Sequence, residues 1–581
     1  MNHPLLVFCI TSLGFWVAYH TYGRYLAKKI FKLDKHMQTP AHKLNDGSDF
    51  VPSSRQVMFG HHFTSIAGTG PIVGPAIGII WGWLPACLWI VFGSIFMGAV
   101  HDFGALVISM RNNGRSLSDI AGDIIHPRVR LFFYIIVCLS LWIVIAIFGL
   151  VIALIFKQFP ESVWAVWLEI PIAIAFGYSL KRKGSLLIKT AIAVSLLYGC
   201  VYLGMIFPVS LPMLGSLPVT GLWTLILLVY ACIASLTPVS LLLQPRDYIN
   251  AWQLYVALGL IICGLVVSGL QGSLHFVAPA VNLSPIGAPS LWPFLFITIA
   301  CGALSGFHCL VCSGTSSKQI NSETDAQLVG YGSMLIEALL AIVIIIAVGA
   351  GIGMAYTSNG ITLTGIDAFS AHYGTWEASS GLGAKLSAVV IGCANMMGSI
   401  GIPLSAATAI VGVFIASFAG TTLDSATRVQ RYVISECAKH INIKPVQNKY
   451  GATIVAVISA ALLAFSSGMN GKGALALWPL FGAVNQLLGG LALLVITLYI
   501  SKRVGQAGLI AGIPCILVMI MTLWATWLNH NLFIQSKAWL LVIINGILLL
   551  LAIAIIMEGI RHFIALFKSK HIFKRTKRVR V

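Results

Sequence analysis

The chain has 581 residues, of which 58% are hydrophobic and only 9% are charged, and its formal net charge at pH 7 is +19. Its apolar runs of roughly 17 to 30 residues match the roughly 20 residues that a helix needs to cross a bilayer. This composition excludes a soluble multidomain protein and predicts an all-α polytopic membrane protein.

The apolar runs predict about fifteen transmembrane helices. The run at 384–418 is long enough for one broken helix or for two helices. In chain order the spans are expected near residues 4–22, 61–80, 86–110, 131–157, 162–180, 190–209, 221–243, 252–270, 292–312, 327–356, 384–418, 451–466, 476–500, 506–528 and 537–557.

The distribution of basic residues predicts how these spans are oriented. With the N-terminus outside, 32 of the 36 Lys and Arg residues fall in connections on the cytoplasmic side, as the positive-inside rule requires. The C-terminus is then cytoplasmic. Most of the net charge reflects this bias, so the basic tail at 561–581 is expected to meet anionic lipid rather than nucleic acid. The exceptions are Lys157, Lys385, Lys472 and Lys537.

The second span contains unusual helix breakers. The stretch "GHHFTSIAGTGPIVGP" (60–75) carries Pro71 and Pro75, which lack an amide donor. One interpretation is a kinked packing helix with a face of small residues. The other is a discontinuous helix whose free backbone groups bind a substrate or an ion, as in transporters with inverted repeats. The glycines of this stretch, Gly68, Gly70, Gly74 and Gly78, fit both interpretations.

A second interrupted helix at the matching place in the other half of the chain would favour the interpretation of 68–75 as a binding site. Two stretches of the sequence could form such an interruption. In "ASLTPVSLLLQPRDYIN" (234–250) the pair Thr237 and Pro238 breaks a span that ends at Arg246. In "GALSGFHCLVCSGTSSKQ" (302–319), His308 is followed by hydroxyl residues that could hold sodium against the carbonyls of the 68–75 break. These are Ser313, Thr315 and Ser316.

Three acidic residues fall well inside predicted spans: Asp102, Glu169 and Glu337. An ionisable side chain at this depth is costly and therefore rare. Each could be a hydrogen-bonded acid that holds helices together. Each could equally exchange a proton or bind a cation, because burial disfavours the charged carboxylate. Both interpretations stay open.

Other polar residues are candidates for gating or for substrate contact. His61 and His62 are expected at the cytoplasmic mouth of the second span, where adjacent residues point about 100° apart and at most one faces a pathway. Arg246 could bind a substrate carboxylate or could pair locally with Asp247. Asp424 and Arg428 could form an inner gate, or they could lie at a solvated helix end.

Several sequence blocks together resemble the carbon starvation protein A family. They run from about residue 45 to 495, and they include "NDGSDFVPSSRQVMFGHHFTSIAGTGPIVGP", "RNNGRSLSDIAG", "QPRDYIN", "SGFHCLVCSGTSSKQI", "TTLDSATRVQRY" and "LWPLFGAVNQLLGGLAL". The resemblance implies an inner-membrane secondary transporter for nutrient uptake under carbon starvation, working by alternating access. It implies peptides as substrate, or pyruvate in a related branch, with proton or sodium coupling and no cofactor.

The same resemblance implies a core of two inverted five-helix repeats, as in the amino acid, polyamine and organocation transporters. We therefore expect an N-terminal helix and loop (1–60), a transport core (61–420) with repeats near 61–210 and 221–420, accessory helices (421–560) and the basic tail (561–581). Gly68, Gly70, Pro71, Gly74, Thr237, Arg246 and His308 are the expected substrate-binding residues.

Two other classes of function fit a helix bundle without soluble domains. An uncoupled channel needs only a lined pore. A membrane enzyme or metal protein could use His61, His62, Asp102 and His308, but the sequence has no HExxH motif.

Overall fold

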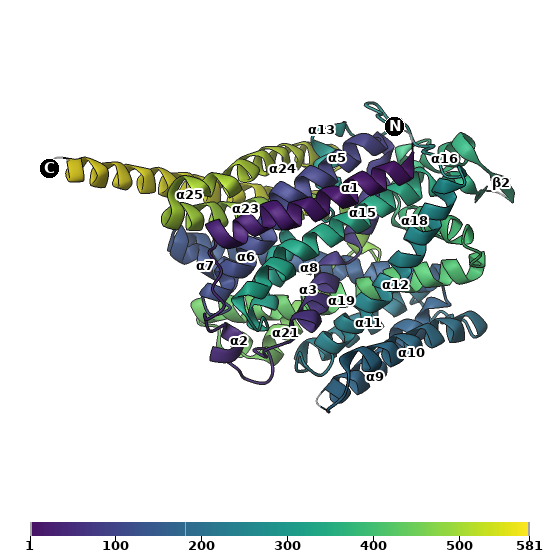
Figure 1. Ribbon diagram of the computed structural model, residues 1–581, viewed down its shortest axis with the longest axis horizontal. Coiled ribbons are helices and arrows are strands. Elements are labelled where there is room, and N and C mark those ends of the chain that lie inside the picture. Colours follow the sequence, from purple (N-terminus) through teal and green to yellow (C-terminus); the bar gives the residue numbers. More distant parts are fainter. Residues whose placement is uncertain (1–2, 181, 359, 579–581) are drawn as a thin grey trace.

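The computed structural model describes residues 3–180, 182–358 and 360–578, with side chains up to residue 565 (Figure 1). Helices make up most of this part, which confirms the predicted helical class. Its strands are β1 (Tyr356–Ser358) and β2 (Ile361–Leu363), an antiparallel hairpin in which Tyr356 lies opposite Leu363. The last three residues of the predicted basic tail, 579–581, lie outside the described residues.

The helices up to residue 270 form the first half of the bundle. They are α1 (Pro4–Ala18), α2 (Pro40–Lys43), α3 (Arg55–Ala67), α4 (Gly70–Gly78), α5 (Trp83–Gly93), α6 (Ala99–Arg111), α7 (Leu117–Ile124), α8 (Pro127–Gln158), α9 (Ser162–Leu180), α10 (Leu186–Ile206), α11 (Val219–Leu236) and α12 (Leu243–Leu270).

The helices after residue 290 form the second half. They are α13 (Leu291–Thr298), α14 (Gly306–Gly314), α15 (Ser333–Gly349), α16 (Gly365–Tyr373), α17 (Trp376–Ser380), α18 (Leu382–Gly398), α19 (Leu404–His440), α20 (Lys444–Gln447), α21 (Lys449–Ala464), α22 (Gly473–Ala476), α23 (Trp478–Val504), α24 (Leu509–Gln535) and α25 (Trp539–Arg578).

Within the described part, 11 helical stretches are long and apolar enough to cross a membrane, or up to 12 if the bent pair α3–α4 is one span. The predicted count of about fifteen is therefore not confirmed. The counts differ partly because the predicted spans 292–312 and 451–466 contain only short helices, α13, α14 and α21, with 8, 9 and 16 residues. In addition, the predicted spans 476–500 and 506–528 both lie in one counted helical stretch, Trp478–Gln535. The run at 384–418 divides into two helices, α18 and α19.

The second span is interrupted at Gly68 and Thr69, where α3 and α4 meet at an angle of 42°. Pro71 lies in the first turn of α4, a position that needs no amide donor. Pro75 lies inside α4 and does not end it. The predicted discontinuity is thus real but shorter than 68–75.

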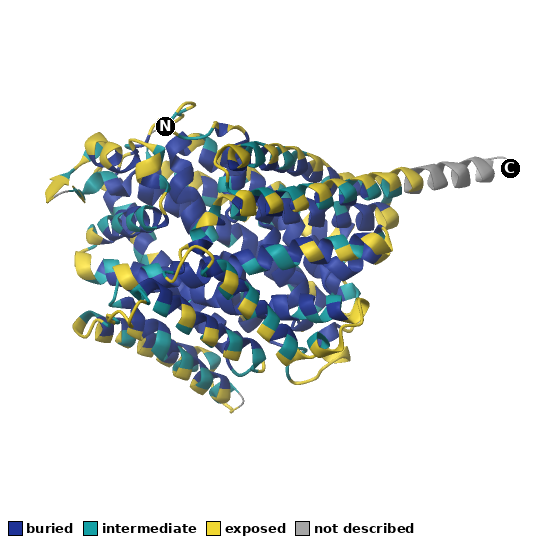
Figure 2. Cartoon of the chain, turned by 180° about the vertical axis from the view of Figure 1, so that it is seen from behind, coloured by how far each residue is buried: buried dark blue, intermediate teal, exposed yellow. Residues whose placement is uncertain are grey.

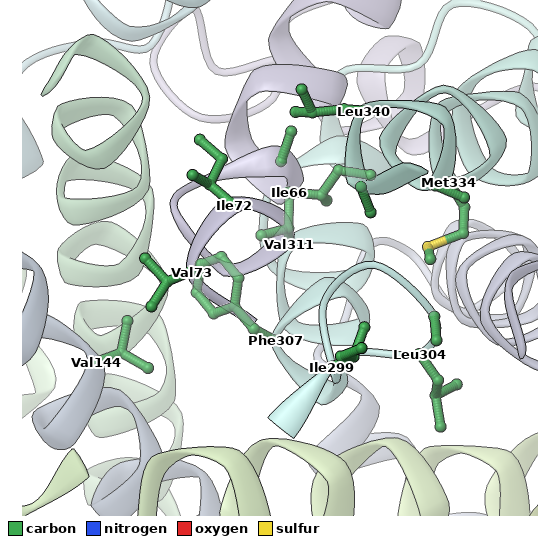
Figure 3. Packing of buried hydrophobic residues seen from close by; sticks show 14 of the residues in the cluster. Ile66, Ile72, Val73, Val144, Ile299, Leu304, Phe307, Val311, Met334 and Leu340 are labelled. Carbon is green, nitrogen blue, oxygen red and sulfur yellow. The ribbon is translucent and has the colours of Figure 1, made fainter. Parts of the chain in front are cut away.

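The second interruption lies between α13 and α14, at residues 299–305, in the later of the two candidate stretches. The two interrupted helices pack against each other, since a Cβ added at Gly74 would lie 2.6 Å from the Thr298 carbonyl oxygen. Figure 3 shows Val73 of α4 close to the ring of Phe307 of α14 in this view. The Thr237–Pro238 break, by contrast, separates α11 from α12 and lies between two helices.

Two long helices, α8 with 32 residues and α19 with 37, pack along each other behind the crossing. Large exposed apolar side chains, such as Leu13, Leu187 and Leu550, lie on the outer helices α1, α10 and α25. Figure 2 shows the buried residues filling the interior, with exposed residues around it. An apolar exterior around an apolar core is what a lipid environment requires, so the protein is a multi-pass membrane protein.

Candidate functional site

A cavity of about 640 Å³ adjoins both interruptions. Thr69, Gly70 and Gly74 line it from the first interrupted helix, and Thr298 and Cys301 line it from the second. Aromatic rings and a few polar groups complete the wall: Phe294, Trp376, Ser380, Lys385, Trp478, Phe481 and Asn529. A mostly apolar cavity with few polar groups is typical of a small-molecule site.

The cavity lies toward the face that carries α16, α17 and the β-hairpin (Figure 1), since Trp376 of α17 and the 287–289 segment belong to its wall. Of the predicted substrate-binding residues, Gly70 and Gly74 line it. Gly68 and Pro71 are buried in the adjoining backbone. The remaining three lie away from the cavity: Arg246 and His308 belong to separate buried networks, and the carbonyl oxygen of the partly buried Thr237 accepts from Arg428.

One network joins two of the predicted ion-coupling acids to a histidine. His308 Nδ1 on α14 lies 2.9 Å from Asp102 Oδ2 on α6, and His308 Nε2 lies 3.3 Å from Glu337 Oε2 on α15. His101 Nδ1 contacts the other Asp102 oxygen at 2.7 Å. All four side chains have 0% exposure. The sequence identified the two acids but not that His308 lies between them.

Glu337 is the least satisfied member of this network. Neither of its carboxyl oxygens has a hydrogen-bond partner among the described residues, although the His308 ring is close. A buried charge without a full set of partners is costly, and one proton taken up or released is the simplest way to avoid that cost. The arrangement can therefore hold and release a proton between His308 and Glu337.

His61 and His62 lie deeper than predicted. Both have 0% exposure, because α3 begins at Arg55 and places them two turns inside the helix. His61 Nδ1 contacts Asp247 Oδ2 at 2.5 Å, and His62 Nδ1 contacts Ser316 Oγ at 2.7 Å. Neither ring is exposed in this conformation, and the two rings point to different neighbours.

Arg246 lies in the first turn of α12 and is 1% exposed. Its guanidinium donates to Glu169 Oε1 at 2.7 Å and to Asp424. Tyr230 also donates to Asp424, at 2.8 Å. Local pairing of Arg246 with Asp247 is thus wrong, because Asp247 contacts His61 instead. Glu169 is a partner of Arg246 and is separate from the Asp102 network.

On the face opposite the cavity, the 44–54 segment is held against α19. Asp49 accepts hydrogen bonds from Arg428 at 2.9 Å and from Arg431 at 3.2 Å. Burial raises the pKa of Asp49, but the charges of Arg431 and Arg428 outweigh this and hold it below its usual value. Arg428 also donates to the Thr237 carbonyl oxygen. We call the 44–54 segment with Arg428 and Arg431 the Asp49 seal.

The hydroxyls predicted to hold sodium have protein partners. Ser313 donates to the Cys309 carbonyl oxygen, and Thr315 accepts from Gln319 at 2.7 Å. Ser316 contacts His62. Thr315 and Ser316 thus lie beside α3, and Ser313 lies against α7. Residues 298–301, by contrast, lie against Gly70 and Gly74. The predicted arrangement of these hydroxyls against the 68–75 carbonyls is wrong, because α14 begins beyond the interruption.

Sequence reasoning missed Lys385, Asp49 and Asp247 as members of these sites. Lys385 is one of the four basic residues outside the cytoplasmic connections, which was a usable signal. Asp247 follows Arg246 directly and could have been assigned a partner of its own. Nothing local distinguishes Asp49, whose partners are more than 370 residues away.

Known proteins resemble this chain over most of its length. Residues 3–525 match the family described as carbon starvation protein CstA. The chain is 33% identical to a peptide transporter CstA of Helicobacter pylori, over 89% of this chain and 80% of that protein. It is 31% identical to the peptide transporter CstA of Bacillus subtilis, over 95% and 96% of the two chains. It is also 32% identical to the pyruvate/proton symporter BtsT of Escherichia coli, over 88% and 80%.

Proposed function

The chain belongs to the carbon starvation protein CstA family, and on this premise we propose that it is a secondary active transporter that imports small nutrients under carbon starvation. The protein is a membrane transport protein and not an enzyme. Peptides are the first candidate substrates, because several similar proteins are peptide transporters. Pyruvate or another small carboxylate is the alternative, because one similar protein is a pyruvate/proton symporter.

One arrangement supports this proposal most: a cavity meets two interrupted helices, and the opposite face is closed. Gly70 and Cys301 bring both interruptions to the cavity wall. Interrupted helices at membrane depth are tolerated where they line a cavity, and in transporters they form the substrate site. On the other side, the Asp49 seal joins α19 to the 44–54 segment. Alternating access would open this seal while the cavity closes.

We propose that the cavity faces outward. The connections rich in Lys and Arg, at 23–54 and 111–130, contain α2 and α7, on the face opposite α16 and the β-hairpin (Figure 1). The positive-inside rule assigns this basic face to the cytoplasm of the plasma membrane. The N-terminus is then outside and the C-terminus inside, and the described conformation is open to the outside.

We propose a proton as the coupling ion, carried between His308 and Glu337. The support is geometric: His308 contacts Asp102 through one ring nitrogen and faces Glu337 with the other. A neutral His308 with a protonated Glu337, and a protonated His308 with an ionised Glu337, differ by one transfer over 3.3 Å. Since α6, α14 and α15 each supply one group, a shift of α14 would change the distances.

We propose that sodium remains the alternative coupling ion. Ser313, Thr315 and Ser316 stay candidates for that role without the 68–75 carbonyls as further ligands, and they would have to release their present protein partners. The gating roles proposed for His61, His62, Asp424 and Arg428 fit their position between α3, α12, α14 and α19.

We also propose a division into repeats that differs from the predicted one, 61–210 and 221–420, because it places α11 and α12 in the first repeat. Each repeat would begin with an interrupted helix: α3/α4, α5/α6, α8, α11 and α12 in the first, and α13/α14, α15, α19, α21 and α23 in the second. In support, α3 packs on α12 as α14 packs on α23, and α8 packs on α19. The core would extend past residue 420, because α19 passes through it without interruption. The helices α24 and α25 would be accessory.

The test is uptake into proteoliposomes containing the purified protein. Labelled dipeptide, tripeptide and pyruvate are compared under an imposed proton gradient, an imposed sodium gradient and no gradient. We expect accumulation above the outside concentration with the proton gradient and its loss with a protonophore. Uptake that only equilibrates would support a channel instead. No uptake of any of the three substrates, with protein shown to be inserted, would refute the proposal.

A further inference from the structure

Lys385 is the one charged side chain among the cavity-lining residues that the structure describes. It is only 3% exposed and lies in the first turn of α18. Its ammonium group lies 4.8 Å from the centre of the Trp478 ring. Within the described part of the chain, this ammonium has no ion pair or hydrogen bond. Among the described residues, the Trp478 ring is therefore the one stabilising partner of this ammonium.

A buried ammonium group without a counter-charge is energetically costly. The buried arginines of this protein avoid that cost, since Arg246 faces Glu169 and Arg428 faces Asp49. Lys385 instead faces an open space of about 640 Å³. An anionic ligand bound in that space could therefore supply the counter-charge that Lys385 lacks.

Three helices begin at the same wall. Gly70, Leu382 and Trp478 are the first residues of α4, α18 and α23, and all three line the cavity. A helix N-terminus carries a partial positive charge that favours an anion. In α4 and α23 this contribution comes from the dipole, since Pro71 and Pro479 at the second position have no amide hydrogen. A lysine in the first turn of α18 opposes this dipole, so its position is hard to explain by helix stability.

The rest of the wall favours an anion with an apolar part. No Asp or Glu occurs among the described lining residues, so the local charge is positive. Trp376, Trp478 and Phe294 provide apolar surface on several sides. A carboxylate is the anion that an ammonium and helix N-termini bind well, and a short apolar body would contact the rings.

We propose that Lys385 binds the carboxylate of the transported substrate, so that the protein selects small molecules with a free carboxylate next to an apolar group. This inference rests on the proposed transport function and adds the recognition element. It applies to peptides through their C-terminus and to pyruvate alike. Amides and esters of the same molecules, which lack the negative charge, would be poor substrates.

The test compares matched pairs of probes in proteoliposomes: dialanine against dialanine amide, and pyruvate against methyl pyruvate, each as a competitor of uptake. We expect wild-type protein to prefer the acid by about 10- to 150-fold, the range of a charge-assisted hydrogen bond. K385Q should reduce this preference to about 3-fold or less, and K385R should retain most of it. K472Q is the control, because Lys472 is exposed and lies just before α22.

A second measurement uses wild-type protein only, so that it does not depend on folding of a variant. Lysines are methylated reductively with and without excess dialanine or pyruvate, and labelling is read by mass spectrometry. We expect the acids to protect Lys385 and the amide and the ester not to protect it. Lys472 should be labelled equally in all samples.

The outcomes separate the two claims. Transport with an unchanged acid preference in K385Q, or equal labelling of Lys385 with and without the acids, would overturn the role of Lys385 and leave the transport function standing. Absence of transport in the wild type would refute the proposed function, and this inference with it.

Discussion

Replacing Gly70 by alanine tests whether the contact between the two interruptions controls transport. A Cβ at this position would lie 2.2 Å from Cys301 Sγ and 2.5 Å from Cys301 Cβ. Carbon atoms in contact lie about 3.5–4.0 Å apart, so the two segments must separate by about 1 Å. Rotation of the cysteine cannot relieve this clash, because Cβ is fixed by the backbone. Overpacking of this kind costs about 1–3 kcal/mol, or roughly 5- to 150-fold in an equilibrium constant.

We therefore expect G70A to insert normally and to lose most of its initial uptake rate in proteoliposomes. The double variant G70A/C301G should recover activity, because the next atom, Cys301 Cα, lies 3.9 Å from the new Cβ. G259A is the control, since nothing lies within 4 Å of a Cβ at that position. Uptake by G70A within about two-fold of the wild type would refute the reasoning. Equal loss in the single and double variants would refute the proposed contact.

Three further changes test the buried networks. E337Q removes the acid facing His308. Proton-driven accumulation should therefore disappear, while exchange of labelled for unlabelled substrate persists. Loss of both activities would contradict a specific role in coupling. R246M leaves the Glu169 carboxylate buried without its cation. This should lower the free energy of unfolding, measured by heat or denaturant, by roughly 3–5 kcal/mol. The surface variant R561M is the control, and its free energy of unfolding should change little. D49N should lower the unfolding temperature at neutral pH, because the pKa of Asp49 is held below its usual value of about 4. The carboxylate stabilises the seal fully above that value and less as the pH falls through the lower folded pKa, so wild type and D49N should converge in acid; a difference that persists unchanged below about pH 3 would contradict the assignment.

The helix interruptions could be predicted because they depend on local composition. Gly68 and Pro71 end one helix and begin the next, and the 302–306 stretch has glycines and Ser305 where α14 begins. The exact break at 68–69 could not be predicted, because Pro75 is a helix breaker that this helix accommodates. The transmembrane count is not confirmed for a related reason. Short half-helices and long continuous spans have similar mean hydropathy.

The partners of buried charges depend on tertiary contacts and could not be predicted from local patterns. Arg246 is bound by residues 77 and 178 positions away, although an acid follows it directly in the chain. Likewise, His308 bridges two acids that the sequence identified separately. Lys385 was visible only as an exception to the positive-inside pattern, and its importance depends on the cavity in front of it.

The Asp49 seal is continuous with the first interrupted helix, because the 44–54 segment leads directly into α3 at Arg55. A displacement of the seal would therefore pull α3, while α4 stays fixed against residues 298–301. The two residues at 68–69 would then act as a hinge that lets α3 move independently of α4. In mechanical terms, α3 would act as a lever. The Asp49 seal lies at its N-terminal end, and the hinge at residues 68–69 lies at its other end, beside the cavity. Cross-linking α3 to α12 across the His61–Asp247 contact should thus block turnover without blocking substrate binding in the cavity.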